Sequence, residues 1–173
     1  MTPVENPHAR VARRLVVGIG EAAVSDQPGD VIVTHALGSC IAVCIWDPVV
    51  RVGGMLHFLL PDSRINPQRS TQQPAAFADT GIPLLFQSAY ALGLQKSRAV
   101  VHVIGGADIV GEASTTALNV GRRNIVSAKN LLWRNGVLIR NELTGGSVAR
   151  TVTLSLETGR ILITSGRETV MEL

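Results

Sequence analysis

The sequence predicts an α+β fold, a layered sandwich of mostly antiparallel sheets flanked by helices. Three observations support this prediction: short β-branched runs recur between glycines and prolines, two longer segments have helical periodicity, and the C-terminal tail alternates in the manner of strands. Of the 173 residues, 46% are apolar and 17% are charged, which is enough for one packed core. We therefore expect a flexible N-terminal arm over residues 1–13 and a single domain over residues 14–173.

The first part of the chain is predicted to be mainly strand. Its apolar runs end at glycine or proline, as expected of strands bounded by turns. They cover residues 14–20, 31–34, 41–46 and 52–60. The last two runs, separated by the break at Asp47-Pro48, are expected to form a β-hairpin or two neighbouring strands. The polar residues 62–74 are predicted to form an exposed loop.

Two helices and four further strands are predicted after this loop. One helix has Asp79 or Thr80 as its N-cap and ends at Gly93, and the other spans residues 119–135. Their apolar faces are predicted as Leu85, Ala89 and Leu92 in the first helix, and Ile125, Ala128 and Leu132 in the second. The strands are predicted over residues 98–104, 137–141, 151–156 and 161–164.

The composition argues against several classes of function. Only 3% of the residues are aromatic and the formal net charge is +3, so binding to nucleic acid is not expected. The apolar runs are far shorter than the roughly 20 residues of a membrane-spanning helix, and residues 1–14 lack the apolar centre of a signal peptide. Together these features predict a cytoplasmic protein without membrane insertion.

The chain has two cysteines, Cys40 and Cys44. On a strand this separation is about 13 Å, beyond the 7 Å limit for a disulfide, so a redox pair would require a helical segment. The two thiols and His57 do not match a zinc-ligand spacing, and no metal is predicted. Gly18-Ile19-Gly20 does not predict a nucleotide site either, because too few residues follow it to form the helix that such a motif requires.

Cys40 and His57 form a candidate nucleophile and base. If residues 41–46 and 52–60 pair so that partner positions sum to 99, His57 lies opposite Ala42 and diagonally beside Cys40. An imidazole in that place can activate a thiol that is mostly protonated at neutral pH. Without further evidence, however, a buried strand cysteine is usually a small apolar residue and a lone histidine is usually structural.

Three residues near Cys40 can complete this candidate site. The Thr34 hydroxyl can bond one ring nitrogen of His57 and so fix the tautomer of the ring. Gly38 and Ser39 directly precede the thiol, where a close backbone approach and free N–H groups would stabilise an oxyanion.

Two motifs contain these residues, THALGSC at residues 34–40 and GGMLHFLLP at residues 53–61. They closely resemble the bacterial CheD family of chemoreceptor glutamine deamidases. The resemblance covers about residues 15–165. Its further landmarks follow in the same order: Gly20-Glu21, Pro28-Gly29-Asp30, Asp79-Thr80-Gly81-Ile82-Pro83, Gly105-Gly106-Ala107, Val120-Gly121-Arg122-Arg123-Asn124 and Gly145-Gly146.

The resemblance implies that Cys40, His57 and Thr34 are the catalytic residues of a cofactor-free hydrolase. The implied reaction converts receptor glutamines to glutamate with release of ammonia, on the cytoplasmic domains of chemoreceptors. It also implies a sandwich related to the deamidating toxins of the cytotoxic necrotising factor type, and CheC, a phosphatase of the chemotaxis response regulator, as a partner. The alternative is a non-catalytic chemotaxis protein that binds CheC or receptors.

Two segments depart from the family pattern. Phe77-Ala78-Asp79 stands where Tyr-Gly-Asp is common, and Ala149 stands where a glycine usually precedes the late arginine. Neither segment contains one of the three implied catalytic residues, so both are interpreted as changes to substrate or partner surfaces.

Overall fold

The computed structural model describes residues 12–109 and 119–173. In these ranges the strands are β1 Arg14–Val16, β2 Glu21–Ser25, β3 Val31–Leu37, β4 Ile41–Asp47, β5 Val52–Phe58, β6 Val100–Gly105, β7 Asn141–Thr144, β8 Arg150–Ser155, β9 Ile161–Ser165 and β10 Glu168–Glu172. The α-helices are α1 Pro67–Gln72, α2 Ala78–Ala91 and α3 Val120–Arg134, and short 3-10 helices cover Ser63–Ile65, Pro74–Ala76 and Lys96–Arg98. No helix of the described ranges is both long and apolar enough to cross a membrane.

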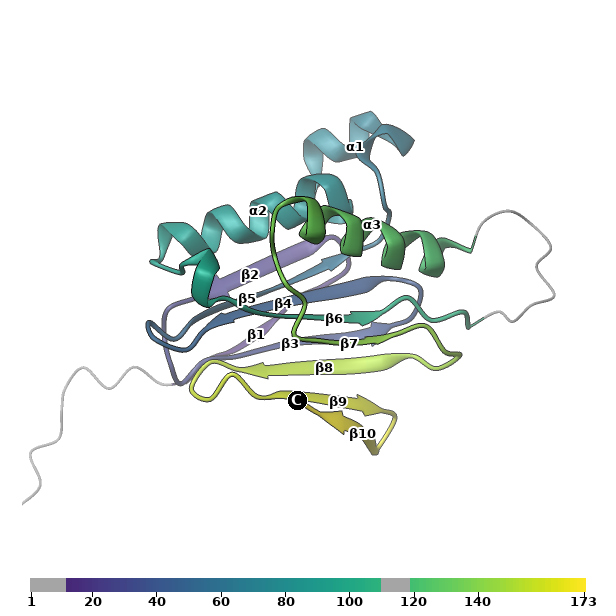
Figure 1. The fold of residues 1–173 in the computed structure, drawn as a ribbon. Helices are drawn as coiled ribbons and strands as arrows, with labels where there is room; N and C mark the ends of the chain where they lie inside the picture. The colour runs from purple at the N-terminus through teal and green to yellow at the C-terminus, as the bar shows by residue number, and fades with distance from the viewer. Residues whose placement is uncertain (1–11, 110–118) are drawn as a thin grey trace, which may run out of the picture.

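The strands form two five-stranded sheets, which confirms the predicted α+β class. One sheet has the order β1-β3-β8-β9-β10 and the other the order β2-β5-β4-β6-β7. The β1–β3 and β6–β7 pairs are parallel and the other pairs are antiparallel. Helices α2 and α3 lie along one face of the sheet that contains β4, and the second sheet lies on its opposite face (Figure 1). The long helices therefore cover one side of the sandwich.

Strand β4 is the centre of the molecule. It pairs with β5 on one side and β6 on the other, and its side chains alternate between two apolar cores. The core beneath the helices contains Ile41, Val43 and Ile45, and the core between the sheets contains Ala42 and Cys44. Burial on both faces explains why this strand is an uninterrupted apolar run in the sequence.

The pairing of β4 with β5 has the predicted register. Ala42 lies opposite His57, and Cys44 lies opposite Met55. A slip of one residue would turn His57 away from the inter-sheet core and towards the helices, where its neighbours would be apolar. The register of this hairpin therefore decides which layer contains the imidazole.

Residues 62–74 are exposed or half-buried as predicted, but they do not form a loop, because they contain helix α1 and the 3-10 helix Ser63–Ile65. The Asn66 side chain caps α1 by accepting a hydrogen bond from the Arg69 backbone N–H. Pro67 occupies the first helical position, where no backbone donor is required. The Asn-Pro pair is therefore a helix start and not a turn.

Strands β2 and β10 were not predicted, because their sequences do not alternate between apolar and polar residues. Both lie at sheet edges, and most of their side chains are exposed or half-buried. The strand predicted over residues 137–141 is also misplaced, since β7 begins only at Asn141. Val137 instead completes the end of α3 by donating a hydrogen bond to the Leu132 carbonyl.

Helix α2 begins slightly earlier than predicted. Phe77 is its N-cap residue without a side-chain hydrogen bond, and Asp79 lies in the first turn. Leu85 and Ala89 are buried as expected, whereas Leu92 is exposed because the helix has already ended. Gly93 follows with a positive φ, as expected of a helix terminator.

Residues 1–11 of the predicted N-terminal arm lie outside the described ranges. Arg13, at its end, forms a salt bridge with Asp30, whose other carboxylate contacts include the Ser25 hydroxyl. The hydrogen bond from Arg13 lowers the pKa of Asp30 to about 2, while burial of the carboxyl group acts in the opposite direction. Arg13 thereby ties the start of β1 to the turn before β3.

The Asp30 carboxylate makes the protein acid-sensitive. A carboxyl group with a depressed folded-state pKa stabilises the fold above its unfolded pKa, and this contribution disappears as the pH falls from about 4 to about 2. We expect Asp30→Asn to lower the free energy of unfolding by on the order of 2 kcal/mol at pH 7 and to flatten its dependence on pH below 4. Urea unfolding at a series of pH values measures this. Asp26→Asn, at an exposed neighbouring carboxyl, is the control, and equal losses in both variants would contradict the assignment.

Candidate active site

Thr34 and His57 come from different sheets and meet between them. Thr34 lies on β3 and His57 on β5, and 2.7 Å separates Thr34 Oγ1 from His57 Nδ1. Both side chains are buried, with His57 only 1% exposed. The contact predicted between this hydroxyl and the ring is therefore present.

The hydrogen bonds of Thr34 determine the tautomer of His57. Thr34 Oγ1 also lies 2.7 Å from the Val17 carbonyl, which can only accept, so the single hydroxyl proton points to that oxygen. Thr34 must then accept from His57, which places the ring proton on Nδ1 and the lone pair on Nε2. Nε2 is buried and has no hydrogen-bond partner among the described residues.

The surroundings of His57 keep the ring neutral at pH 7. Burial lowers the pKa of His57 to about 4, and the negative charge of Glu21 acts in the opposite direction. Glu21 lies on β2 directly opposite His57 in the strand pairing. A neutral ring with a free lone pair can act as a base, and the nearby carboxylate would stabilise the cation formed when the ring takes a proton.

Cys40 lies at the end of a short segment, residues 38–40, that connects β3 to β4. All three carbonyls of this segment accept hydrogen bonds: Gly38 from the Ala107 N–H, Ser39 from the Asn124 side chain, and Cys40 from the Gly106 N–H. Within the described ranges the Ser39 and Cys40 N–H groups donate to no other residue, and the Cys40 N–H contacts the thiol of its own residue. The segment is thus held by its oxygens, which leaves its N–H groups available for a ligand.

The backbone before this segment is strained. The pairing of β3 with β8 shifts register between Thr34 and Leu37, and Ala36 has a φ of 53°. A left-handed conformation is unfavourable for a residue with a Cβ atom, and such strain often occurs at functional sites. Here it forms an irregularity in β3 just before Leu37, the last residue of the strand, after which the chain crosses to β4.

Gly105 lets β6 approach the Cys40 segment closely. Its φ is 118°, and a Cβ atom at this position would collide with the Cys40 carbonyl. Only glycine combines this conformation with this contact. The Gly105-Gly106 pair of the sequence therefore supports the segment that carries the thiol.

The two cysteines differ in their surroundings, although both are buried. Burial raises the pKa of the Cys40 thiol, and it raises the pKa of Cys44 to about 12. No hydrogen bond joins Cys40 to His57 in the part of the chain that the structure describes. The site as described therefore contains a neutral thiol and a neutral imidazole.

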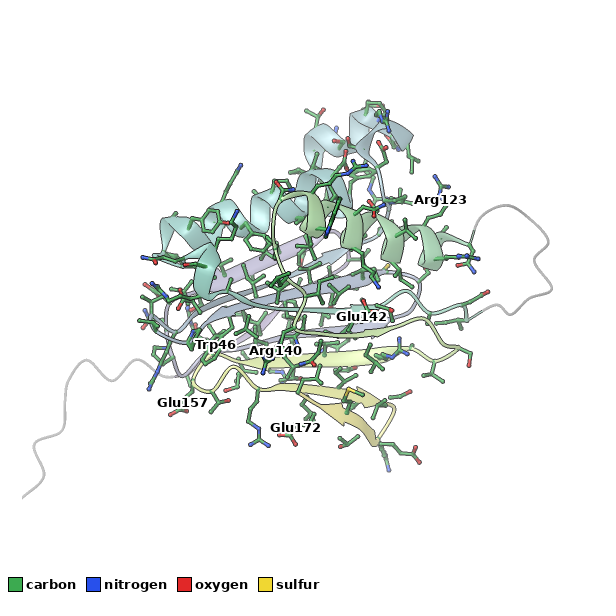
Figure 2. All side chains as sticks on the ribbon, viewed as in Figure 1. Trp46, Arg123, Arg140, Glu142, Glu157 and Glu172 are labelled. Carbon is green, nitrogen blue, oxygen red and sulfur yellow. The ribbon has the colours of Figure 1, made fainter. Side chains whose placement is uncertain are left out.

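These groups lie at one end of the sandwich. Cys40 directly precedes the first residue of β4, whereas Trp46 is near the last, at the opposite end of the molecule from Arg123 on the first turn of α3 (Figure 2). The structure thus places Thr34, Gly38, Ser39, Cys40 and His57 on the end where α3 begins.

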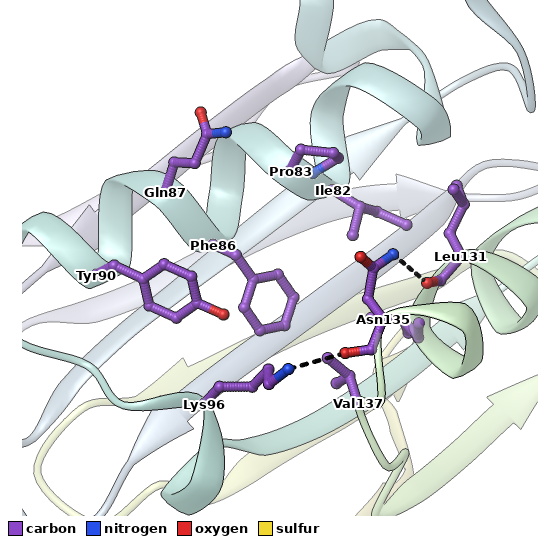
Figure 3. A pocket seen from close by; sticks show the side chains of 10 residues that line it. Ile82, Pro83, Phe86, Gln87, Tyr90, Lys96, Leu131, Asn135 and Val137 are labelled. Carbon is purple, nitrogen blue, oxygen red and sulfur yellow. Dashed lines mark hydrogen bonds between the residues drawn. The ribbon is translucent and has the colours of Figure 1, made fainter.

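A separate groove lies between the helices. It has a volume of about 220 Å³ and is lined by residues of α2 and of the C-terminal end of α3, among them Phe86, Tyr90 and Leu131 (Figure 3). Hydrogen bonds of Lys96 and Asn135 close one side of it. Asn135 is 11 residues beyond Asn124, roughly 16 Å along the helix, so this groove is remote from Cys40.

Asn124 was not predicted to have a role at the site, because the sequence showed it only as part of the motif Val120-Gly121-Arg122-Arg123-Asn124. The structure buries Asn124 completely and joins its amide to the segment that carries Cys40. The signal was present, because Asn124 shares a helix face with Ala128 and Leu132 at a spacing of four residues. A polar residue on an apolar face requires a hydrogen-bond partner inside the protein.

Comparison with known proteins identifies the family to which a chain with this fold and this site belongs. Residues 59–165 match the family described as CheD chemotactic sensory transduction. A relative in Syntrophus aciditrophicus, named "Probable chemoreceptor glutamine deamidase CheD 1", is 46% identical over 92% of this chain and 98% of its own length. The "Chemoreceptor glutamine deamidase CheD" of Thermotoga maritima is 40% identical over 86% of this chain and 89% of its own length.

A third relative, "Probable chemoreceptor glutamine deamidase CheD 2" of Anaeromyxobacter dehalogenans, is 48% identical over 88% of this chain and 94% of its own length. Matches of this extent leave no large part of the relatives unaccounted for. The chain belongs to the CheD family, as its two motifs predicted.

Proposed function

We propose that this chain hydrolyses the side-chain carboxamide of glutamine residues in chemoreceptors, with Cys40 as nucleophile, His57 as base and Thr34 as the residue that orients the ring. The activity is the one that the relatives are named for. The observation that supports these roles most directly is the hydrogen bond from His57 Nδ1 to Thr34, because it leaves Nε2 free to accept a proton.

In the first half of the reaction, His57 Nε2 takes the Cys40 thiol proton as Sγ attacks the carboxamide carbon. The tetrahedral oxyanion is stabilised by the free N–H groups of Ser39 and Cys40. The imidazolium then protonates the departing nitrogen, and the carbon–nitrogen bond breaks. Ammonia is released, and the acyl group remains bound to Cys40 as a thioester. The Glu21 carboxylate opposite His57 favours the transient imidazolium.

In the second half, His57 deprotonates a water molecule that attacks the thioester carbon. The carbon–sulfur bond breaks, the thiolate recovers its proton from the ring, and glutamate is released. One water is consumed and one ammonia is formed for each glutamine. The balance is complete without a metal or an organic cofactor.

The proposal is tested with a cytoplasmic fragment of a receptor. We expect incubation with the protein to raise the fragment mass by about 1 Da per converted glutamine, with one ammonia released for each. Mass spectrometry of peptides locates the sites, and an enzyme-coupled assay measures the ammonia. Binding of the fragment with neither a mass change nor ammonia would instead support the non-catalytic interaction protein.

Thr34→Val tests how the ring is oriented. The change keeps the side-chain shape but leaves the His57 Nδ1–H without its acceptor, and an unpaired buried donor costs about 1 to 3 kcal/mol. We expect kcat for ammonia release to fall about 5- to 150-fold. Thr153→Val on the neighbouring strand β8 is the matched control and should leave kcat unchanged. An equal effect of both variants would assign Thr34 a structural role only.

The proposal also includes three further properties of the protein. Residues 14–173 act as one deamidase domain, the sandwich is related to the cytotoxic necrotising factor-type deamidases, and a CheC-type phosphatase binds the protein. The two-sheet architecture and the family membership are compatible with each. Co-purification with CheC and comparison with a solved toxin structure test the last two.

A further inference from the structure

Asn124 on α3 joins the two chain segments that carry the proposed nucleophile and base. Its Nδ2 donates to the Ser39 carbonyl at 3.0 Å and to the Leu59 carbonyl at 2.8 Å. Ser39 directly precedes Cys40, and Leu59 follows His57 by two residues. A single side-chain amide therefore bridges both segments.

The chemistry of the two partners fixes the orientation of this amide. Both are backbone carbonyl oxygens, which only accept, so only the NH₂ group can face them. Asn124 is fully buried, and its Oδ1 has no hydrogen-bond partner among the described residues. An unpaired buried oxygen costs free energy, so Asn124 is unfavourable here unless its nitrogen compensates for that cost. The two hydrogen bonds of Nδ2 provide this compensation.

The packing of α3 brings Asn124 to this place. A Cβ atom on Gly121 would lie 2.6 Å from the Gly106 carbonyl oxygen. The first turn of α3 can therefore approach the end of β6 this closely only because residue 121 is glycine. Gly106 in turn donates its N–H to the Cys40 carbonyl. Helix, strand end and nucleophile segment thus form one contiguous unit.

We propose that Asn124 is a positioning residue for the deamidation, which sets the distance and orientation of Cys40 relative to His57 by holding the two segments together. This inference rests on the proposed roles of Cys40 and His57. Since no hydrogen bond joins Cys40 to His57 themselves within the described ranges, their relative placement must come from backbone that other groups fix. A misplacement of about 1 Å at a reacting centre can cost about a hundredfold in rate.

Asn124→Leu is the decisive variant. Leucine has the same branched shape and the same number of side-chain heavy atoms as asparagine and favours the helix, but it removes both donors and adds no charge. We expect kcat on a receptor fragment to fall at least tenfold, towards a hundredfold, with KM changed less than threefold. Asn124→Asp places a carboxylate against the two carbonyl oxygens and should lower kcat at least as much.

Ser127→Ala is the matched control on the same helix. Ser127 donates its hydroxyl to the Pro61 carbonyl and so also fastens α3 to the chain after β5, but within the described ranges it forms no side-chain hydrogen bond with residues 38–40. We expect this variant to keep kcat within twofold. Thermal unfolding of both variants shows whether either effect is a general loss of stability.

Alkylation of Cys40 by iodoacetamide, followed by mass spectrometry across a pH series, provides a readout that does not depend on substrate. We expect Asn124→Leu to move the midpoint of this profile towards that of a free thiol, because the segment loosens and Cys40 becomes more exposed, while Ser127→Ala leaves it in place. Unchanged kcat and an unchanged profile in folded Asn124→Leu would overturn the positioning role. Full activity of Cys40→Ala would instead overturn the proposed function, so the two failures are distinguishable.

Discussion

Replacing Cys40 with alanine is expected to abolish ammonia release from receptor fragments, with a loss in kcat of about 10⁴-fold or more. The reason is that the proposed thioester cannot form without the sulfur, and removal of a nucleophile leaves only the rate supplied by binding and by the oxyanion-stabilising groups. Receptor binding should persist, because the change removes one small, nearly buried atom from a site that is otherwise intact. The measurement is the mass shift of the fragment together with the ammonia assay.

Cys44→Ala is the matched control for this variant. Cys44 lies four residues further along the chain, on β4, faces the same inter-sheet core and is 1% exposed, against 6% for Cys40. Because burial raises the pKa of its thiol to about 12, Cys44 is not a nucleophile near neutral pH, and we expect its loss to change kcat less than threefold. Activity retained by Cys40→Ala, or lost equally in both variants, would refute the assignment of the nucleophile.

Replacing His57 with glutamine is expected to lower kcat by about 10² to 10⁴-fold. Glutamine fills a similar space and can still bond Thr34, but its amide cannot take the thiol proton or return it to the leaving nitrogen. His102→Gln is the control, since His102 is a second buried histidine of the same sheet and its ring contacts Asn141 instead of Thr34. Comparable losses in the two variants would mean that buried histidines matter here for folding alone.

The pH dependence of the wild-type protein provides an independent test of the same assignment. Because burial lowers the pKa of His57 to about 4, the ring remains a base down to that pH. We therefore expect kcat/KM to be nearly constant from pH 8 to about 5 and to fall as the pH drops through about 4. A half-loss near the ordinary histidine pKa of about 6.5 would show that the essential base is exposed.

The sequence predicted the part of this site that depends on local alternation and short connections. Cys40 directly precedes the hairpin of β4 and β5, and His57 lies within it. The prediction assumed a register for this hairpin around the Asp47-Pro48 turn, and the structure has that register. The Thr34 contact with His57 was predicted because the hydroxyl can bond a ring nitrogen, and it is present although the two residues come from different sheets. Their catalytic roles remain predictions.

Other features depend on the tertiary structure and could not be predicted in this way. Strand β2 brings Glu21 opposite His57, but it lacks the apolar alternation of a strand, because an edge position exposes most of its side chains. Asn124 lies 85 residues from Ser39, and nothing in the spacing of the sequence joins a helix residue to a carbonyl so distant. Helix α1 was missed because one dipeptide, Asn66-Pro67, is typical both of turns and of helix starts.

The bond between Thr34 and His57 crosses from one sheet to the other, so each half of the sandwich contributes one end of it. The imidazole consequently acquires its tautomer only when both layers have assembled. Competence for catalysis should therefore develop in the same cooperative step as tertiary packing, and a partly folded chain with native strands but separated layers would have no working base. A newly synthesised protein would in this way remain inactive towards glutamines until its fold is complete.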